Sequence, residues 1–299
     1  MKQKNLYLTA AFLLMFVHMT LQTGFSNTLS DKTVSGFVHP ESAACDTDKK
    51  VLYVSQFGSV MDPLLKDGKG KISQLSFSGK IIEENFLPLP GQNLVLHKPK
   101  GIWVENKRLW VADIDTVAVF NLSSRRGEKI SLPDAMFAND PVVMDGVLYV
   151  SDTVGNRIYK IAPADFLDKK PEVTDFVSKL PFAPNGLYPG ANSTLLAAGF
   201  EMDGTNRSVY SIKSDGSFTQ LAKCMGLFDG IARLDNGTLL ITDWKTKSIF
   251  KWSKNSGRKI IASGFMGPAD FCVVDENTHF LFVVPDLIKS ELRFIRMSK

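Results

Sequence analysis

The chain repeats one short phrase six times along its length. In each copy a polar residue beside proline or glycine precedes a small apolar run, and a turn then leads to an aliphatic segment with a polar end. The copies begin at Pro40-Glu41-Ser42-Ala43, Pro99-Lys100-Gly101-Ile102, Asn139-Asp140-Pro141-Val142, Pro184-Asn185-Gly186-Leu187, Phe228-Asp229-Gly230-Ile231 and Pro268-Ala269-Asp270-Phe271. Repeats of roughly 40–45 residues with several short strands are typical of propeller blades. The sequence therefore predicts an all-β protein, a six-bladed β-propeller with four antiparallel strands in each blade.

The turns between the expected strands fit this architecture. Residues 142–161 read V-V-M-D-G-V-L-Y-V-S-D-T-V-G-N-R-I-Y-K-I, in which D-G and G-N are typical of tight hairpins because Gly and Asn tolerate positive φ. Asp113, Asp152 and Asp243 end second strands, and we interpret them as turn caps that accept backbone N–H groups.

The last repeat is one strand short. It offers strands near 270–275, 279–284 and 291–297 before the chain stops, so we expect the segment Lys32–Val38 to supply the fourth strand. Closing the ring in this way removes two exposed strand edges.

The first residues have the features of a secretory signal peptide. Lys2 and Lys4 precede an apolar stretch from Leu6 to about Met19, and small or polar residues follow up to Ser26. We expect residues 1–26 to be removed and residues 27–299 to form the propeller domain. An uncleaved anchor is the alternative, although the apolar part is short for a membrane span. The mature protein is thus expected to be periplasmic or secreted.

Composition limits the partners. The 299 residues carry a net charge of +4 without a basic block, which argues against nucleic acid, and no later segment of the mature chain is apolar enough to span a membrane. A closed propeller leaves no strand edge that needs a partner, so we expect a monomer. Trp103, Trp110, Trp244 and Trp252 lie in strand patterns and are assigned to the core.

The three cysteines leave two interpretations open. Cys45 and Cys272 fall on the first strands of the first and last repeats, which are neighbours in a closed ring, and Cys224 makes the number odd. We expect these side chains to be small buried apolar groups. A disulfide between Cys45 and Cys272 across the closing seam is the alternative.

Equivalent positions in the repeats should meet around the axis. Aligning the repeats places Glu41, Lys100, Asp140, Asn185, Asp229 and Ala269 in one column, with Asn139 in place of Asp140 if the third repeat shifts by one residue. Carboxylates and carboxamides gathered in this way suit a hard divalent cation such as Ca²⁺, which takes 6–8 oxygen ligands. Zinc suits the column less, since no His or Cys joins it. A water-filled polar channel is the alternative.

Four of these motifs together resemble the regucalcin/gluconolactonase family and, more distantly, the paraoxonases. They are P-E-S-A at 40–43, N-D at 139–140, P-N-G-L at 184–187 and D-G-I at 229–231. The resemblance implies a six-bladed propeller with a divalent cation, usually Ca²⁺, at the top of the central channel. It also implies hydrolysis of lactones or organophosphate esters, with a small-molecule lactone or ester as the partner.

The resemblance also implies roles for individual residues. Glu41, Asn185 and Asp229 match metal ligands, and Asn139 matches the asparagine that contacts the metal directly or through water or substrate. Asp229 matches the proposed general base or nucleophile. Asp140 and Asp270 are expected behind these ligands.

Two positions depart from the family pattern. Phe137 stands where gluconolactonases often have a sugar-binding arginine, and Lys100 stands where paraoxonases have a catalytic histidine. We expect both residues at the substrate. Lys100 would hold an anionic substrate or act as a base, or else it would form a salt bridge with Glu41 or Asp140. These changes favour an acidic or less polar lactone.

Two functions of different class remain. The first is an exported, Ca²⁺-dependent lactonase or esterase. The second is a noncatalytic binding module, because residues 148–161 also resemble NHL repeats. The K-D-G-K-G-K run at 66–71 lies in a long insertion of the first repeat, which we interpret as a flexible hairpin tip, with a lid over the channel mouth as the alternative.

Overall fold

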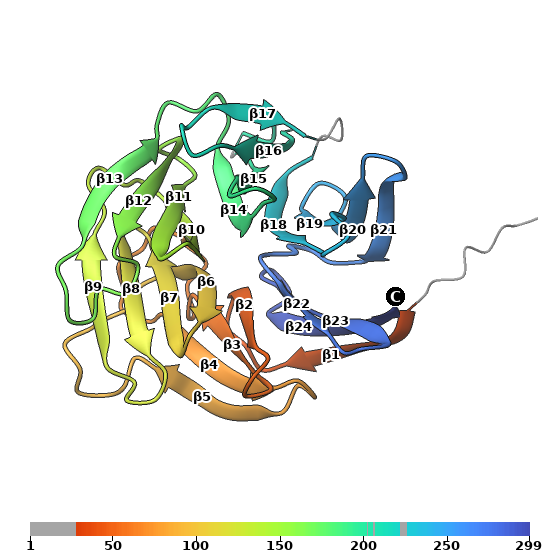
Figure 1. Ribbon diagram of the computed structural model, residues 1–299. Coiled ribbons are helices and arrows are strands. Elements are labelled where there is room, and N and C mark those ends of the chain that lie inside the picture. The colour runs from red at the N-terminus through yellow and green to blue at the C-terminus, as the bar shows by residue number, and fades with distance from the viewer. Residues whose placement is uncertain (1–27, 202, 206, 222–225) are drawn as a thin grey trace, which may run out of the picture.

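The computed structural model describes residues 28–201, 203–205, 207–221 and 226–299, and these form strands joined by turns and loops. Figure 1 shows six sheets arranged as a ring around a central axis. Each sheet has four strands, all paired antiparallel to their neighbours. The predicted six-bladed β-propeller is confirmed. The expected signal peptide, residues 1–26, lies outside the described residues.

Each blade runs from an innermost to an outermost strand in chain order. Blade one consists of β2 (Pro40–Asp46), β3 (Val51–Gln56), β4 (Lys71–Ser76) and β5 (Ile81–Leu87). Blade two consists of β6 (Pro99–Glu105), β7 (Arg108–Asp113), β8 (Thr116–Asn121) and β9 (Gly127–Ser131). Blade three consists of β10 (Ala138–Met144), β11 (Val147–Asp152), β12 (Arg157–Ala162) and β13 (Glu172–Val177).

The second half of the ring repeats this order. Blade four consists of β14 (Pro184–Pro189), β15 (Leu195–Gly199), β16 (Val209–Ile212) and β17 (Phe218–Gln220). Blade five consists of β18 (Phe228–Arg233), β19 (Leu239–Asp243), β20 (Ser248–Ser253) and β21 (Gly257–Ser263). Blade six consists of β22 (Cys272–Asp275), β23 (His279–Asp286), β24 (Glu291–Ser298) and, from the other end of the chain, β1 (Thr28–Ser35).

Strand β1 closes the ring as expected, although it begins and ends earlier than the segment Lys32–Val38. It pairs antiparallel with β24, with Asp31 opposite Ile295 and Ser35 opposite Glu291. Figure 1 shows β1, in the red of the chain's first described residues, beside the blue β24 of its last residues. The last blade therefore joins the two ends of the described chain.

A disulfide between Cys45 and Cys272 crosses the same seam, with the two Cα atoms 5.8 Å apart. It joins β2 of blade one to β22 of blade six. The expectation that these two cysteines are free buried thiols is therefore wrong, and the alternative interpretation holds. The two residues lie on neighbouring inner strands because the ring closes.

The apolar core lies between neighbouring blades. Trp110 and Val119 of blade two pack in one buried cluster with Val150 and Tyr159 of blade three. Strands with both faces covered carry nearly continuous aliphatic and aromatic runs, which explains the repeated V-L-Y-V pattern. Within the described residues, no helix is long and apolar enough to cross a membrane.

The aspartates at the ends of the second strands are the expected turn caps. Asp113 accepts hydrogen bonds from the backbone N–H groups of His97 and Lys98, at 2.8 and 2.7 Å. Asp152 accepts from Phe137 and Gly155 in the same way. Each cap fixes the loop that leads into an innermost strand, and therefore the first residues of that strand.

Candidate functional site

A cavity of about 230 Å³ lies at the end of the axis where the innermost strands begin; we call it the upper cavity. Five of the residues expected on the axis line it, namely Glu41, Lys100, Asn139, Asn185 and Asp229. Each is the second residue of its innermost strand, β2, β6, β10, β14 or β18. The structure thus brings together the metal-ligand set that the sequence proposed, with Asn139 rather than Asp140 at this level.

An irregularity in strand pairing turns these side chains toward the axis. The register between the first and second strands shifts between Pro40 and Ser42, and the equivalent shift occurs at the start of β6, β10, β14 and β18. A bulge of this kind redirects a side chain that regular pleating would place elsewhere. The shared bulge explains why the polar residue of these five repeats faces the axis.

The glycine that follows the polar residue lets neighbouring inner strands approach closely. A Cβ atom on Gly186 would lie 2.3 Å from the backbone oxygen of Asp229, and one on Gly101 would lie 2.2 Å from Asp140 Oδ1. No side chain fits at either position without movement of the next strand. The P-x-G and D-G motifs therefore reflect packing around a narrow axis.

Hydroxyl groups on the second strands fix the backbone of the site. Ser151 Oγ accepts from Asp140 N and donates to the carbonyl oxygen of Asn185 at 2.7 Å, which ties blade three to blade four. Ser55 Oγ donates in the same way to the carbonyl oxygen of Lys100. These residues were not identified as part of the site from the sequence. A sequence pattern could have identified them, because a Ser or Thr directly precedes the polar last residue of several second strands.

Two buried carboxylate oxygens at the upper cavity have no hydrogen-bond partner among the described residues, Glu41 Oε2 and Asp229 Oδ1. The other oxygen of Asp229, Oδ2, accepts from Trp244 Nε1 at 2.7 Å. Trp244 lines the cavity, so its assignment to the core is wrong. An unpartnered buried carboxylate oxygen is costly, and a cation would satisfy it.

Asn139 is oriented by Thr153, another residue of the site that was not identified from the sequence. Asn139 Nδ2 donates to Thr153 Oγ1 at 2.9 Å, and Thr153 Oγ1 donates to the carbonyl oxygen of Pro184. This orientation uses the NH₂ branch of the amide and keeps the carbonyl branch, Oδ1, as the acceptor. An acceptor oxygen is the group of Asn that binds a hard cation.

The upper site combines two carboxylates with two carboxamides. Within the described part of the chain, no group of three or more His, Cys, Asp or Glu side chains is placed to hold a metal. A cation here would therefore need the amide oxygens of Asn139 and Asn185 as well as Glu41 and Asp229. That oxygen-only set fits Ca²⁺ and does not suit Zn²⁺.

Burial and mutual repulsion raise the pKa values of the axial carboxyl groups. Burial, then the charge of Asp229, raises the pKa of Glu41 well above its usual range. Burial, then the charge of Asp270, raises the pKa of Asp229 to about 8. Burial likewise raises the pKa of Asp270 to about 7, although the hydrogen bond from Ser42 opposes the change. The channel therefore holds more negative charge than it can keep without protons or a cation.

Lys100 is buried and its ammonium group is held by backbone carbonyls. Nζ donates to the oxygens of Pro63 and Lys98, at 3.1 and 3.4 Å, and lies 4.2 Å from the centre of the Phe137 ring. Among the described residues, no ion pair joins Lys100 to Glu41 or Asp140, so the expected salt bridge is not formed. Burial lowers the pKa of Lys100 to about 8, with the charge of Glu41 acting in the opposite direction.

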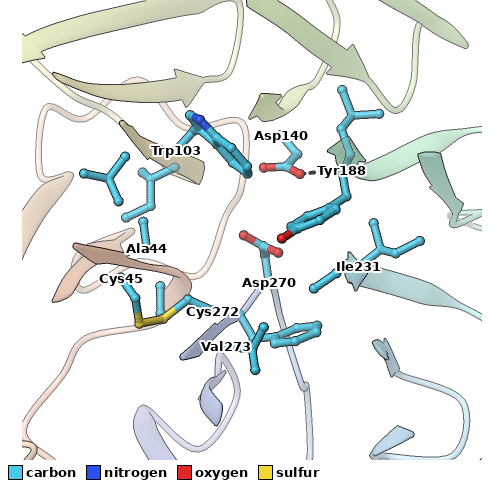
Figure 2. Close-up of a pocket in the computed structure, with 15 residues that line it drawn as sticks. Ala44, Cys45, Trp103, Asp140, Tyr188, Ile231, Asp270, Cys272 and Val273 are labelled. Carbon is cyan, nitrogen blue, oxygen red and sulfur yellow. Dashed lines mark hydrogen bonds between the residues drawn. A yellow bond between two sulfur atoms is a disulfide. The ribbon is translucent and has the colours of Figure 1, made fainter. Parts of the chain in front are cut away.

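Asp140 and Asp270 face a second, lower cavity of about 140 Å³, shown in Figure 2. Asp140 Oδ2 accepts from Leu187 N at 2.6 Å, and Asp270 Oδ2 accepts from Ser42 Oγ at 2.5 Å. Trp103 and Tyr188 flank the two carboxylates, and the disulfide lies at the edge of the group. Asp140 thus lies one position further along β10 than Asn139 of the upper cavity, and Asp270 lies just before β22.

The insertion of the first repeat covers part of the upper cavity. We call residues 57–70, between β3 and β4, the strap. Phe57, Met61 and Pro63 of the strap line the upper cavity beside the axial residues. The structure favours the expected alternative, a cover over the mouth, above a free hairpin tip.

Solved structures with the same architecture show how widely this fold is used. No protein-family model matches the sequence, and no curated protein matches it. A gluconolactonase from Xanthomonas campestris is similar with a TM-score of 0.66 at 10% identity, over 91% of each chain. Virginiamycin B lyase from Staphylococcus aureus has a TM-score of 0.60 at 14% identity, over 90% of this chain and all of its own.

A third similar structure is named as a WD40 domain and not as an enzyme. The WD40 β-propeller domain of Doa1 has a TM-score of 0.60 at 14% identity, over 86% of this chain and 78% of its own. At such identities the likeness establishes the fold. The protein is thus a β-propeller of the architecture shared by gluconolactonases and virginiamycin B lyase, and function has to be argued from its own site.

Proposed function

We propose that the protein is an exported, divalent-metal-dependent hydrolase of lactones or esters, with Ca²⁺ as the best-fitting metal. The observation that carries this proposal is the pair of buried, unpartnered oxygens, Glu41 Oε2 and Asp229 Oδ1, at one cavity with Asn139 and Asn185. A scaffold that only binds other proteins has no need to bury such groups on its axis.

The residues of the site have separate roles in this proposal. Glu41, Asn139, Asn185 and Asp229 would hold the cation, which when bound supplies a positive charge that polarises a carbonyl oxygen or a water molecule. Asp229 is the base, because its carboxylate lines the cavity in which the substrate would lie. Trp244 keeps Asp229 in one orientation through the hydrogen bond to Oδ2.

Export is supported by the character of the first residues and by the disulfide. Lys2 and Lys4 before an apolar stretch fit a signal peptide, and disulfides persist in oxidising compartments. The mature protein would then act in a periplasm or outside the cell.

The test is a calcium titration followed by thermal unfolding. A ligand that binds only the folded state stabilises it, by about 2.7 kcal/mol at 100 times its Kd. We expect Ca²⁺ to raise the melting temperature of the wild-type protein and to have no effect on Asp229→Ala or Glu41→Gln. The exposed Asp215 provides the control, since Asp215→Ala should respond like the wild type.

Activity is then measured on a panel of lactones and aryl esters with product analysis by mass. Hydrolysis adds the mass of one water to a lactone, whereas ring opening by elimination does not, so the products separate hydrolase from lyase chemistry. Absence of any Ca²⁺ response, together with no turnover across the panel, would refute the proposal. The noncatalytic binding module would then be the better hypothesis.

A further inference from the structure

Above the polar floor of the upper cavity, the wall is apolar. The side chains that form it are Phe57, Met61, Pro63, Phe137, Phe200, Trp244 and Leu287, contributed by loops of several blades. We call these residues the collar. Phe57 and Leu287 belong to one buried apolar cluster with Ala269, and Trp244 packs against it. Phe200 meets the Trp244 ring edge-on at 5.9 Å.

A polyol ligand would find few partners in this collar. Its hydroxyl groups would lose their water against aromatic and aliphatic surface without gaining hydrogen bonds, which is unfavourable. An alkyl, acyl or aryl group would instead leave water for that surface and gain from it. The chemistry of the collar therefore favours a substrate with an apolar substituent.

The strap supplies part of the collar, and two buried lysines hold it there. Lys98 is fully buried, and its Nζ donates to the carbonyl oxygens of Phe57 and Val60, both at 3.0 Å, and to Asp67 Oδ2 at 2.7 Å. These three bonds use all three donors of the ammonium group. Lys100 adds a bond to the carbonyl oxygen of Pro63 at 3.1 Å.

Close backbone packing fixes the ends of the strap. A Cβ atom on Gly70 would lie 2.3 Å from Pro99 Cδ, and one on Gly58 would lie 2.7 Å from Lys69 O. Gly68 N also donates to His97 Nδ1 at 3.0 Å. The strap is thus attached along its length to the segment that leads into β6.

Lys100 is therefore not free to bind an anionic group of a substrate. Its ammonium lies between the Phe57 and Phe137 rings, 5.7 and 4.2 Å from their centres, and is bonded to the strap. By binding the carbonyl oxygen of Pro63, Lys100 positions the strap, which forms part of the cavity wall. The expectation of an acidic substrate loses its main support, and that of a less polar substrate gains support.

Exposed apolar side chains lie directly beside collar residues in the chain. Val60, Leu64, Met136 and Ile288 are each 43–56% exposed and lie on loops that also contribute collar residues. Exposed apolar side chains beside a cavity are characteristic of ligand-binding grooves. A substituent longer than the cavity would extend toward these side chains.

We infer that the upper cavity takes a lactone or ester with an apolar alkyl, acyl or aryl substituent, and that the strap, positioned by Lys98 and Lys100, provides the selecting wall. This inference rests on the proposed function, which identifies the reacting group of the substrate as a lactone or an ester. The apolar contribution to binding is independent of metal, so it is measurable without turnover.

The test uses 5-alkyl-2-pyrrolidinones, lactam analogues of alkyl lactones that resist hydrolysis, in a series from methyl to octyl. Binding is followed by tryptophan fluorescence with EDTA present. Each buried methylene should raise the affinity about fourfold until the cavity is filled. Met61→Ser should flatten this dependence. Ile82→Ser should leave it unchanged, because Ile82 is an exposed apolar residue on β5, the outermost strand of blade one, and does not line the cavity.

The strap is tested through its ion pairs. Asp67→Asn weakens the bond to Lys98 and should reduce the affinity for the octyl ligand more than for the methyl ligand. Asp115→Asn, which breaks the exposed pair with Lys66 on the same strap, is the matched control and should have little effect.

The outcomes separate the inference from the proposed function. Affinity that does not depend on chain length, equal effects of Met61→Ser and Ile82→Ser, or preferential turnover of sugar lactones would overturn the inference while leaving a hydrolase. Chain-length-dependent binding in a protein that neither responds to Ca²⁺ nor opens any lactone or ester would refute the hydrolase and leave an apolar binding site.

Discussion

At the scale of single residues, the axial carboxyl groups have pKa values raised above those of carboxyl groups in water. Glu41, Asp140, Asp229 and Asp270 are all buried, and each has a raised pKa, first because of burial. A carboxyl group whose pKa is raised by folding stabilises the folded state while it is protonated. That contribution is complete below the unfolded value of about 4 and is lost as the pH rises through the folded value.

The metal-free protein should consequently become less stable as the pH rises from about 5 to about 8. Asp270 and Asp229 would lose their protons near 7 and 8 and repel one another in the channel. Lys100 acts in the opposite direction only above about 8, where its folded form is already neutral. The measurement is the melting temperature in EDTA across this pH range.

Calcium and one variant provide the controls for this pH dependence. Added Ca²⁺ should restore most of the stability at the alkaline end and little at the acidic end, because protons and the cation compete for the same oxygens. Asp229→Asn should flatten the decline. A melting temperature in EDTA that is constant or rises with pH would contradict the expected titration of the channel.

The sequence could predict which residues meet on the axis, but not how they are held. Glu41, Asn185 and Asp229 follow from the repeat, because equivalent positions in a ring of blades must converge. The choice of Asn139 over Asp140 depends on the bulge at the start of β10, and a one-residue shift turns a side chain elsewhere. Trp244 and Lys98 could not be predicted, since their roles come from loops whose paths the repeat does not specify.

At the scale of strands, the innermost strands of blades two, four and five combine a bulge with a glycine. The bulge directs the polar side chain to the axis, and the glycine admits the neighbouring strand. The strap, between β3 and β4, is the longest of the described loops that join a second strand to a third. The sequence predicted an insertion there but did not determine whether it covers the cavity. Its position follows from the two buried lysines. The sequence places Lys100 on the axis but does not indicate that Lys98 or Lys100 binds the strap.

Gly186 offers a direct test of the close approach of inner strands. In Gly186→Ala the new methyl group would meet the Asp229 backbone oxygen, so β18 has to move away from β14. Such overpacking typically costs about 1–3 kcal/mol. We expect a lower melting temperature and a weaker Ca²⁺ response, since Asp229 would move with its backbone. Loss of stability with an unchanged Ca²⁺ response would show that the ligand position does not depend on this contact.

At the scale of the whole molecule, the ring is closed by noncovalent and covalent links that join distant parts of the chain. Strand β1 completes blade six beside β24, and an ion pair between Asp31 and Arg293 supports that pairing. The Cys45–Cys272 disulfide joins the innermost strand of blade one to that of blade six. Closure by β1 was predictable because the last repeat lacks a strand. The disulfide was not, because sequence position on neighbouring strands permits a bond without requiring one.

The disulfide should contribute substantially to stability because it closes a very long loop. Its cysteines are 227 residues apart in sequence, and cross-linking restricts the unfolded chain more as the loop lengthens. We expect Cys45→Ala/Cys272→Ala to lose about 2–5 kcal/mol of unfolding free energy, with each kcal/mol lowering the melting temperature by about 2–4 °C. Dithiothreitol should lower the melting temperature of the wild type toward that of the double variant and leave the variant itself unchanged. Because β1 still closes blade six when the bond is absent, the reduced ring should remain folded and keep its Ca²⁺ response. Loss of that response on reduction would instead mean that the seam positions Glu41, which lies four residues before Cys45 on the same strand.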